Sequence, residues 1–247
     1  MKKVFLVLFL TVLTMASLNL NATDKSVTMS EDALGEAIRS YLLENPKVMA
    51  EVFENTQRYL IAEDEKRQSE ILKKNSDALY NDKRDFSIGR PDAPITVVEF
   101  FDYNCGYCKR AFPDIMKLTQ KNPDVRVVFK EFPILGPASE QAARAALASK
   151  SEGKYFAIHQ SLLNARGNVS GAALSSLIEK HGLNADEIVT RGKNKDIDAH
   201  IMDVRNLAQS LGVNGTPAFV IDNQLFSGAL SYDDMQKLID EIRSSAN

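Results

Sequence analysis

The sequence predicts an α/β fold preceded by a helical extension, and three observations lead to this prediction. An apolar run at residues 95–101 is followed by a helical pattern at 109–121 and by a second apolar run at 125–132. Near the C-terminus, a short apolar run at 218–221 precedes a tight turn and a helix. Residues 139–211, between these two parts, have the composition and spacing of helices.

The first two apolar runs predict a βαβ unit. Residues 95–101 and 125–132 have the length and composition of buried strands, and Pro133 ends the second strand. Strands joined through a helix are parallel to each other. Near the C-terminus, a turn at residues 222–223 predicts a hairpin between 218–221 and 224–226, and a last helix is expected at 232–242.

Composition limits the function classes. The chain has 247 residues, of which 44% are hydrophobic and 26% are charged, so it can bury one large core or two smaller ones. Its formal net charge of −3 argues against a general nucleic-acid-binding protein.

The first residues have the pattern of a secretory signal peptide. Lys2 and Lys3 precede an apolar segment at 4–13, and small residues such as Ala22 offer a cleavage site. We therefore expect residues 1–22 to be removed on export. The alternative is an uncleaved anchor, although the apolar segment is short for a membrane-spanning helix.

Residues 30–62 predict two amphipathic helices. Ser30 is a helix-capping residue, Asn45 and Pro46 separate the helices, and apolar residues recur at helical spacing on both sides. Residues 63–85 are dominated by charge, which indicates an exposed helix or a mobile linker. The apolar faces upstream favour self-association. The alternative is that they dock on the α/β domain of the same chain.

The predicted organisation follows from these patterns. A signal peptide at 1–22 precedes a helical oligomerisation region at 23–62 and a charged linker or helix at 63–88. A C-terminal α/β domain spans 89–247, with a helical insertion at about 137–211.

Cys105 and Cys108 are the only cysteines, and they lie where the first predicted strand meets the helix. Two cysteines separated by two residues at such a junction are typical of a redox dithiol. Unpaired N–H groups and the helix dipole lower the pKa of the first cysteine, so Cys105 is the predicted nucleophile and Cys108 the resolving thiol. The alternative is half of a zinc site, which would need two further ligands.

The dithiol is unsuited to a structural role. A disulfide that closes only two intervening residues constrains the unfolded chain very little. In an exported protein its value must therefore be chemical.

These residues resemble the DsbA-like branch of the thioredoxin superfamily. The resemblance covers residues 95–243 and rests on the segment 99–108, on the helical insertion and on Gly215-Thr216-Pro217. Residues 31–60 are similar to the N-terminal segment of the suppressor-of-copper-sensitivity protein C (ScsC) group. The resemblance implies a thioredoxin fold with an inserted helical subdomain.

The resemblance also implies roles for individual residues. Pro217 should follow a cis peptide bond opposite the dithiol, and the backbone of Thr216 should pair with an extended substrate. Gly106 and Tyr107, between the cysteines, should contact the substrate as well. Glu99 should be a buried acid that exchanges a proton with Cys108. An exposed position is the alternative for Glu99.

Several charged and titratable residues are less clearly assigned. Lys130 either pairs with Glu99 or is solvated.

The family's strong oxidants carry Pro-His between the cysteines, whereas this chain has Gly106 and Tyr107, so we expect weaker thiolate stabilisation and a less oxidising disulfide. Lys109 and Arg110 either restore positive potential or are ordinary surface residues. The histidines are expected on the surface or in packing roles: His159, His181 and His200.

The function predicted from the sequence is that of a periplasmic thiol–disulfide oxidoreductase, an isomerase more than a strong oxidase. No cofactor and no metal are required. Expected partners are unfolded or wrongly disulfide-bonded exported proteins, a membrane redox protein that recycles the dithiol, and further copies of the chain, for example in a trimer. Nucleic acid is not an expected partner. The alternative is a copper-binding or chaperone-type exported protein that uses the two thiols as soft ligands.

Overall fold

The computed structural model describes residues 29–245, so the predicted signal peptide lies outside the described residues. The chain divides into two compact units, residues 1–57 and residues 58–247. Helix α2 (Pro46–Lys74) runs through the division, so each unit is described separately.

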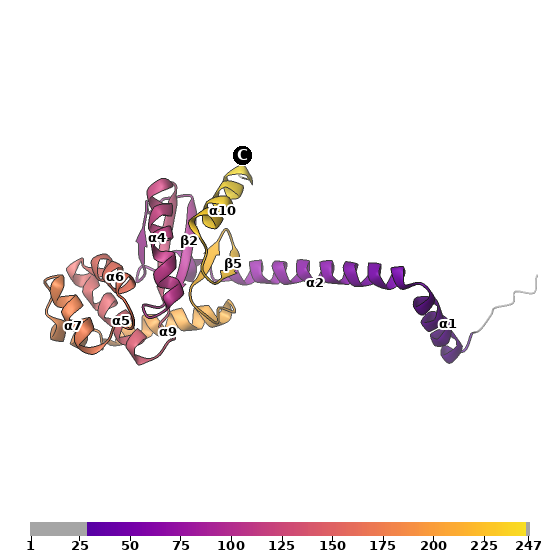
Figure 1. Cartoon of the computed structure of the whole chain (residues 1–247), viewed down its shortest axis with the longest axis horizontal. Helices are drawn as coiled ribbons and strands as arrows, with labels where there is room; N and C mark the ends of the chain where they lie inside the picture. The colour runs from indigo at the N-terminus through magenta and orange to yellow at the C-terminus, as the bar shows by residue number, and fades with distance from the viewer. Residues whose placement is uncertain (1–28, 246–247) are drawn as a thin grey trace, which may run out of the picture. The chain divides into compact units, whose positions relative to one another are not determined.

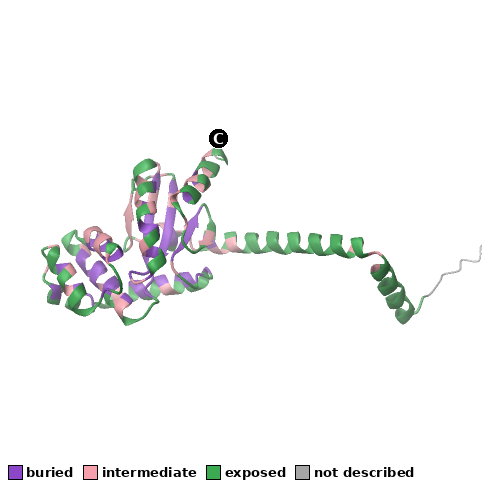
Figure 2. Cartoon of the chain, in the orientation of Figure 1, coloured by how far each residue is buried: buried purple, intermediate pink, exposed green. Residues whose placement is uncertain are grey.

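The described part of the first unit consists of α1 (Glu31–Glu44) and the beginning of α2. Ser30 caps α1 by accepting a hydrogen bond from the backbone N–H of Ala33 at 3.3 Å. Asn45 ends α1, and Pro46 begins α2 at a position where a missing N–H costs nothing. These boundaries confirm the predicted helices. No residue of α1 is buried within the chain, and α1 and most of α2 are exposed (Figure 2).

The second unit is built around a five-stranded sheet (Figure 1). Its strands lie in the order β1-β3-β2-β4-β5, and only β2 and β3 are parallel, as the predicted βαβ unit requires. Asp222 and Asn223 form the hairpin turn with φ angles of 48° and 56°, the left-handed values of a type I′ turn. The strands are β1 (Phe86–Ile88), β2 (Ile95–Phe101), β3 (Val125–Glu131), β4 (Ala218–Ile221) and β5 (Gln224–Ser227).

One face of the sheet is covered by α4 (Gly106–Lys121) and α10 (Tyr232–Ser245). Buried side chains of both helices pack with Val97 and Phe101 of β2 in one apolar cluster. The helix after β2 therefore begins at Gly106, three residues earlier than its apolar pattern suggested, and includes one of the two cysteines. This start places Cys105 directly at the helix N-terminus.

The other face is covered by α9 (Lys195–Ser210), the end of α2 and the short α3 (Ser76–Tyr80). Leu72 of α2 and Leu79 of α3 are only 1% and 0% exposed, and they pack with Val98 and Phe100 of β2. Residues 72–88 thus belong to the core and sheet of the second unit, whereas we expected a connector up to residue 88. This segment is mostly charged, so the sequence did not indicate that its two leucines would be buried in the core.

The helical insertion lies between β3 and β4, and its helices between residues 137 and 180 lie together beside the sheet (Figure 1). It contains a helix at 185–191 that the sequence did not predict, because only Ala185 and Ile188 of that segment are buried. Asn184 caps this helix by accepting a hydrogen bond from the N–H of Glu187 at 3.1 Å. The insertion comprises α5 (Pro137–Ala148), the 3₁₀ turn η1 (Ser149–Glu152), α6 (Tyr155–Asn164), α7 (Gly171–Lys180), α8 (Ala185–Arg191) and α9.

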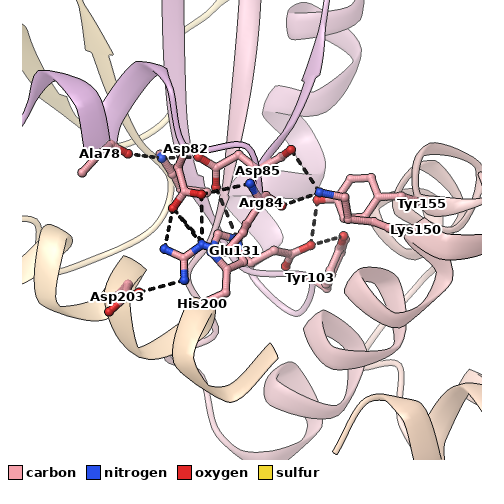
Figure 3. Close-up of polar contacts among 11 residues, drawn as sticks. Ala78, Asp82, Arg84, Asp85, Tyr103, Glu131, Lys150, Tyr155, His200 and Asp203 are labelled. Atoms are coloured by element: carbon pink, nitrogen blue, oxygen red, sulfur yellow. Dashed lines mark hydrogen bonds and ion pairs between the residues drawn. The ribbon is translucent and has the colours of Figure 1, made fainter. Parts of the chain in front are cut away.

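A buried ionic cluster fastens residues 82–85 to the rest of the second unit (Figure 3). Asp85 forms an ion pair with Lys130 of β3, and the side chains of this pair are almost fully buried. His200 of α9 lies 3.4 Å from the carboxylate of Asp85. Arg84 binds Asp82 and reaches Asp203 of α9 at 2.8 Å.

Candidate active site

Cys105 is the N-cap residue of α4 and lies at the carboxyl end of β2. Its sulfur accepts a hydrogen bond from the backbone N–H of Cys108 at 3.4 Å, and its thiol donates one to the carbonyl of Thr216 at 3.2 Å. Both cysteines are free thiols, and Cys108 is fully buried. The structure therefore brings Cys105, Cys108 and Thr216 together, as the sequence suggested.

The two thiols have opposite electrostatic environments. The pKa of Cys105 is lowered to about 5, chiefly by a hydrogen bond with the side chain of Cys108. The side chain of Thr216 and the N–H groups at the helix start lower it further, whereas burial raises it. Burial raises the pKa of Cys108 far above its usual value, and the neighbouring Cys105 and Glu99 raise it further. At neutral pH, Cys105 is a thiolate and Cys108 keeps its proton.

Glu99 is buried in the middle of β2 on the face that α4 covers. Desolvation raises its pKa to about 8, with a smaller contribution from Cys105. Its Oε2 atom has no hydrogen-bond partner among the described residues. A carboxyl group with this pKa exchanges protons readily near neutral pH.

Lys130 does not pair with Glu99. In the register of β2 and β3, Glu99 lies opposite Phe129 and Phe100 lies opposite Lys130, so the two charged side chains project from opposite faces of the sheet. Lys130 instead pairs with Asp85.

The peptide bond between Thr216 and Pro217 is cis, which confirms that expectation. Gly106 and Tyr107 are exposed on the first turn of α4, and 60% of Tyr107 is accessible to solvent. Cys105 itself is only 5% exposed, so these two exposed residues lie beside a largely buried thiol.

Asp102 is a buried residue near the dithiol for which the sequence predicted no role. Its carboxylate accepts hydrogen bonds from the N–H groups of Asn104 at 2.7 Å, Ile134 at 2.9 Å and Leu135 at 3.0 Å. It therefore ties the segment before Cys105 to the segment after β3. An aspartate directly after a buried strand was the only signal in the sequence.

A second buried acid lies beside Tyr103. Glu131, at the end of β3, accepts hydrogen bonds from Tyr103 at 2.7 Å and Tyr155 at 2.8 Å (Figure 3). Burial raises the pKa of Glu131 to about 8. The Tyr103 hydroxyl also lies 3.0 Å from Nδ1 of His159, and burial lowers the pKa of that imidazole to about 3. His159 is thus a neutral packing residue, as expected.

Residues 96–240, which include the dithiol, Glu99 and the Thr216–Pro217 bond, match the family of DSBA-like thioredoxin domains. The chain belongs to this family. The predicted thioredoxin fold with its helical additions is thereby confirmed. The family match and the structural neighbours indicate a DsbA-like thiol–disulfide oxidoreductase.

Two solved structures are similar to this chain, and the similarity covers a different share of the chain in each case. A thioredoxin-like oxidoreductase from Silicibacter pomeroyi DSS-3 is 39% identical, with a TM-score of 0.66, and the similarity covers 68% of this chain and 97% of that one. A linker-deletion mutant of ScsC from Proteus mirabilis is 28% identical, with a TM-score of 0.66, and covers 88% of this chain and 98% of that one. The expected resemblance to ScsC is therefore confirmed.

Curated relatives add two kinds of protein. Disulfide bond formation protein D of Bacillus subtilis (strain 168) is 25% identical over 166 residues, which is 62% of this chain and 75% of that protein. Na⁺/H⁺ antiporter NhaA 1 of Salinispora arenicola (strain CNS-205) is 27% identical over 158 residues. The chain spans only about a quarter of the length of such antiporters, 24% in this case.

None of the helices in the described residues is long and apolar enough to cross a membrane. In the same part of the chain, no three His, Cys, Asp or Glu side chains are grouped as ligands for a metal ion.

Proposed function

We propose that this protein is a periplasmic protein disulfide isomerase that acts as a homo-oligomer. Cys105 is the nucleophile, Cys108 the resolving thiol and Glu99 the proton-exchanging acid. The substrates are exported proteins with incorrect disulfides, and a membrane redox partner keeps the dithiol reduced. The thiolate character of Cys105 beside a protonated Cys108 supports the exchange chemistry.

The exchange proceeds through a mixed disulfide. The Cys105 thiolate attacks one sulfur of a substrate disulfide, the substrate S–S bond breaks, and the other substrate sulfur leaves as a thiolate that takes up a proton. In isomerisation, another substrate thiolate then attacks the mixed disulfide and releases Cys105 unchanged, so no net electrons are transferred. In reduction, Cys108 loses its proton and attacks Cys105, which passes two electrons to the substrate.

The residues around the dithiol serve these steps. Glu99 accepts the Cys108 proton in reduction and returns it in oxidation, because the raised pKa of its carboxyl group lets it hold either state near neutral pH. Thr216, whose carbonyl already contacts the Cys105 thiol, and Pro217 offer backbone to an extended substrate. Gly106 and Tyr107 contact the same substrate.

The observation that carries the isomerase proposal is the absence of a core in the described part of the first unit. Helix α1 and residues 46–57 bury no side chain, although they carry many large apolar residues. A helix of 14 residues such as α1 has little stability in water unless an apolar face is packed, and exposed apolar faces mark interaction surfaces. Association of several copies through these faces would supply that packing. The exposed residues are Leu34, Ile38, Tyr41, Leu43, Met49, Val52 and Phe53.

An oligomer suits isomerisation better than oxidation. Several Cys105 thiolates near one substrate raise the effective concentration of each exchange step. A substrate with more than one wrong disulfide can then be engaged repeatedly before it is released.

A paired assay on the purified mature protein tests this function. We expect recovery of activity from scrambled ribonuclease, and slow oxidation of a reduced two-cysteine peptide. Fast peptide oxidation without ribonuclease recovery would indicate an oxidase. Prevention of aggregation that persists in a Cys105→Ser, Cys108→Ser double variant, without ribonuclease recovery, would indicate a chaperone.

Trapping experiments in cells test the cysteine roles and the compartment together. The Cys108→Ser variant should accumulate mixed disulfides with exported proteins, because the resolving thiol is missing. The Cys105→Ser variant should accumulate few. Release of the protein with the periplasmic fraction is expected, and retention in the cytoplasm would contradict the proposed location.

A further inference from the structure

Arg110 lies across the residues between the two cysteines. Its guanidinium carbon is 4.3 Å from the centre of the Tyr107 ring, a cation–π distance. A β-carbon placed on Gly106 would lie 3.5 Å from Nη1 of the same arginine. Residues one turn apart on a helix face the same side, so Arg110 rises from α4 toward the start of the helix where Cys105 lies. The guanidinium is therefore held against the first turn of α4, beside the two residues that separate the cysteines.

The hydrogen-bonding fork of Arg110 is unoccupied. Within the described residues from Arg67 onward, every arginine except Arg110 and Arg166 donates to a carboxylate or a backbone carbonyl. Arg110 has only its contact with the Tyr107 ring. An exposed guanidinium that an aromatic ring orients is ready to bind a planar anion with two parallel hydrogen bonds.

Arg166 lies in a loop that is fastened to the same helix. The ammonium group of Lys109 donates to the carbonyl of Ala165 at 2.8 Å and to that of Gly167 at 2.6 Å, on either side of Arg166. Asn104 also holds this loop, through the N–H of Val169 at 2.9 Å. Lys109 is therefore engaged with the loop, whereas Arg110 and Arg166 are left for a ligand.

We propose that Arg110 is a specificity-determining residue that selects substrate polypeptides with a carboxylate side chain next to the exchanging cysteine. Arg166 supplies a second, weaker cation on the loop that Lys109 and Asn104 fix in place. The proposal rests on the exchange activity proposed above and names the substrate class of the same site.

The positive charge of the two arginines favours an acidic substrate residue over a basic or an apolar one. The chain as a whole has a net charge of −3, yet Arg110 lies on the helix turn that follows Cys105, and Arg166 belongs to a loop fastened to the same helix. A substrate cysteine bound to Cys105 must pass close to Gly106, which has no side chain to keep a neighbouring carboxylate away from Arg110. A lysine at the same substrate position would face two like charges.

The test measures how fast the reduced protein reduces a family of cyclic disulfide peptides. The peptides are identical except for Glu, Gln or Lys beside one cysteine, and reaction is followed by acid quench and mass spectrometry. Each turnover converts the peptide disulfide to two thiols and the protein dithiol to its disulfide. We expect the Glu peptide to react about three- to fivefold faster than the Gln peptide at low salt, a ratio typical of partly exposed ion pairs. The ratio should approach one at high salt, where such pairs are screened.

Variants separate recognition from general electrostatic effects. Arg110→Gln should reduce the Glu-to-Gln ratio to about one, and Arg166→Gln should lower it less. A change in the reactivity of Cys105 would alter all peptides equally and leave the ratio unchanged. Lys117→Gln is the matched control. Lys117 is also on α4, but its ammonium group lies over the ring of Tyr232 of α10, so its loss should keep the wild-type ratio.

The outcomes distinguish the two proposals. Equal rates for the three peptides, or a Glu preference that survives Arg110→Gln, would overturn the role of Arg110 and leave the exchange activity standing. Failure to reduce any peptide would overturn the exchange activity and this inference with it.

Discussion

Cys105 combines a helix N-terminus with side-chain hydrogen bonds, and together they hold its pKa near 5 without a cation between the cysteines. Reported values for related dithiols run from about 3.5 in DsbA to about 7 in thioredoxin. We therefore expect a reduction potential between the values of those two proteins, about −120 and −270 mV. Equilibration of the purified protein with glutathione or dithiothreitol buffers measures it, and a value outside that interval would contradict the electrostatic account.

Thr216 allows a direct test of the Cys105 environment. Thr216→Val removes the hydroxyl whose hydrogen bond lowers the pKa of the Cys105 thiol, while the backbone carbonyl remains. The midpoint of the pH profile for alkylation should rise above about 5 but stay below the free-thiol value of about 8.5, because the larger contribution of the Cys108 side chain remains. A wild-type midpoint already near the free value would show that the helix start does not activate this cysteine.

Glu99 predicts a particular pH dependence of stability. Its pKa is raised from 4.5 to about 8 in the folded chain, so the native state holds a proton that the unfolded state has lost across this window. This contribution to stability is present below pH 4.5 and is lost as the pH rises through 8. Cys105 acts in the opposite direction because its pKa is lowered, so the informative quantity is the difference between wild type and Glu99→Gln.

We expect the free energy of unfolding of wild type to fall relative to that of Glu99→Gln by about 1.4 kcal/mol per pH unit between pH 6 and 8. Urea titrations of the reduced proteins at several pH values measure this difference. The same substitution should slow the resolving step of Cys108 by up to about a hundredfold, since general acid–base catalysis has this size. Parallel stability profiles for the two proteins would show that Glu99 ionises normally.

At the scale of elements, the ionic cluster decides where the second unit begins. Lys130→Met would leave Asp85 buried without its ion-pair partner, at a cost of about 3–5 kcal/mol of unfolding free energy. Hydrogen exchange at residues 81–88 should become faster in this variant. The double variant Lys130→Met, Asp85→Asn should recover much of the loss, because no unpaired charge remains.

Lys83 supplies the control for this prediction. It lies on the same segment but is exposed, so Lys83→Met should change the stability by less than about 0.5 kcal/mol. Equal effects of Lys83→Met and Lys130→Met would show that the buried pair does not anchor the segment.

At the scale of the whole molecule, two N-terminal truncations distinguish loss of oligomerisation from loss of folding stability. Removal of residues up to 57 leaves the second unit complete, so we expect a stable monomer that loses isomerase activity and keeps dithiol exchange. Removal up to residue 88 also deletes Leu72, Leu79 and the edge strand β1, and should cost several kcal/mol through lost apolar burial.

Light scattering and thermal unfolding distinguish these cases. The mature chain should have the mass of an oligomer, and the 58–247 fragment that of a monomer with a cooperative transition. A monomeric mass for the mature chain at micromolar concentration would contradict the assembly. It would leave an oxidase or reductase whose N-terminal helices dock on the same chain.

The sequence by itself determined the features that depend on neighbours along the chain. The capping of α1 by Ser30, the start of α2 at Pro46 and the position of the cysteines at a strand–helix junction all follow from contacts within about four residues. The βαβ unit was equally accessible, because an apolar run, a helix and a second apolar run admit one parallel arrangement.

Only the tertiary structure decided the features that join distant segments. Whether Lys130 meets Glu99 depends on the register of β2 and β3, and a shift of one residue moves a side chain to the other face of the sheet. Lys109 and Asp102 bind backbone groups of loops that lie up to 58 residues away, and carbonyl and N–H groups leave no mark in the sequence. Leu72 and Leu79 are two apolar residues in a charged segment, and the partner surface alone makes them part of a core.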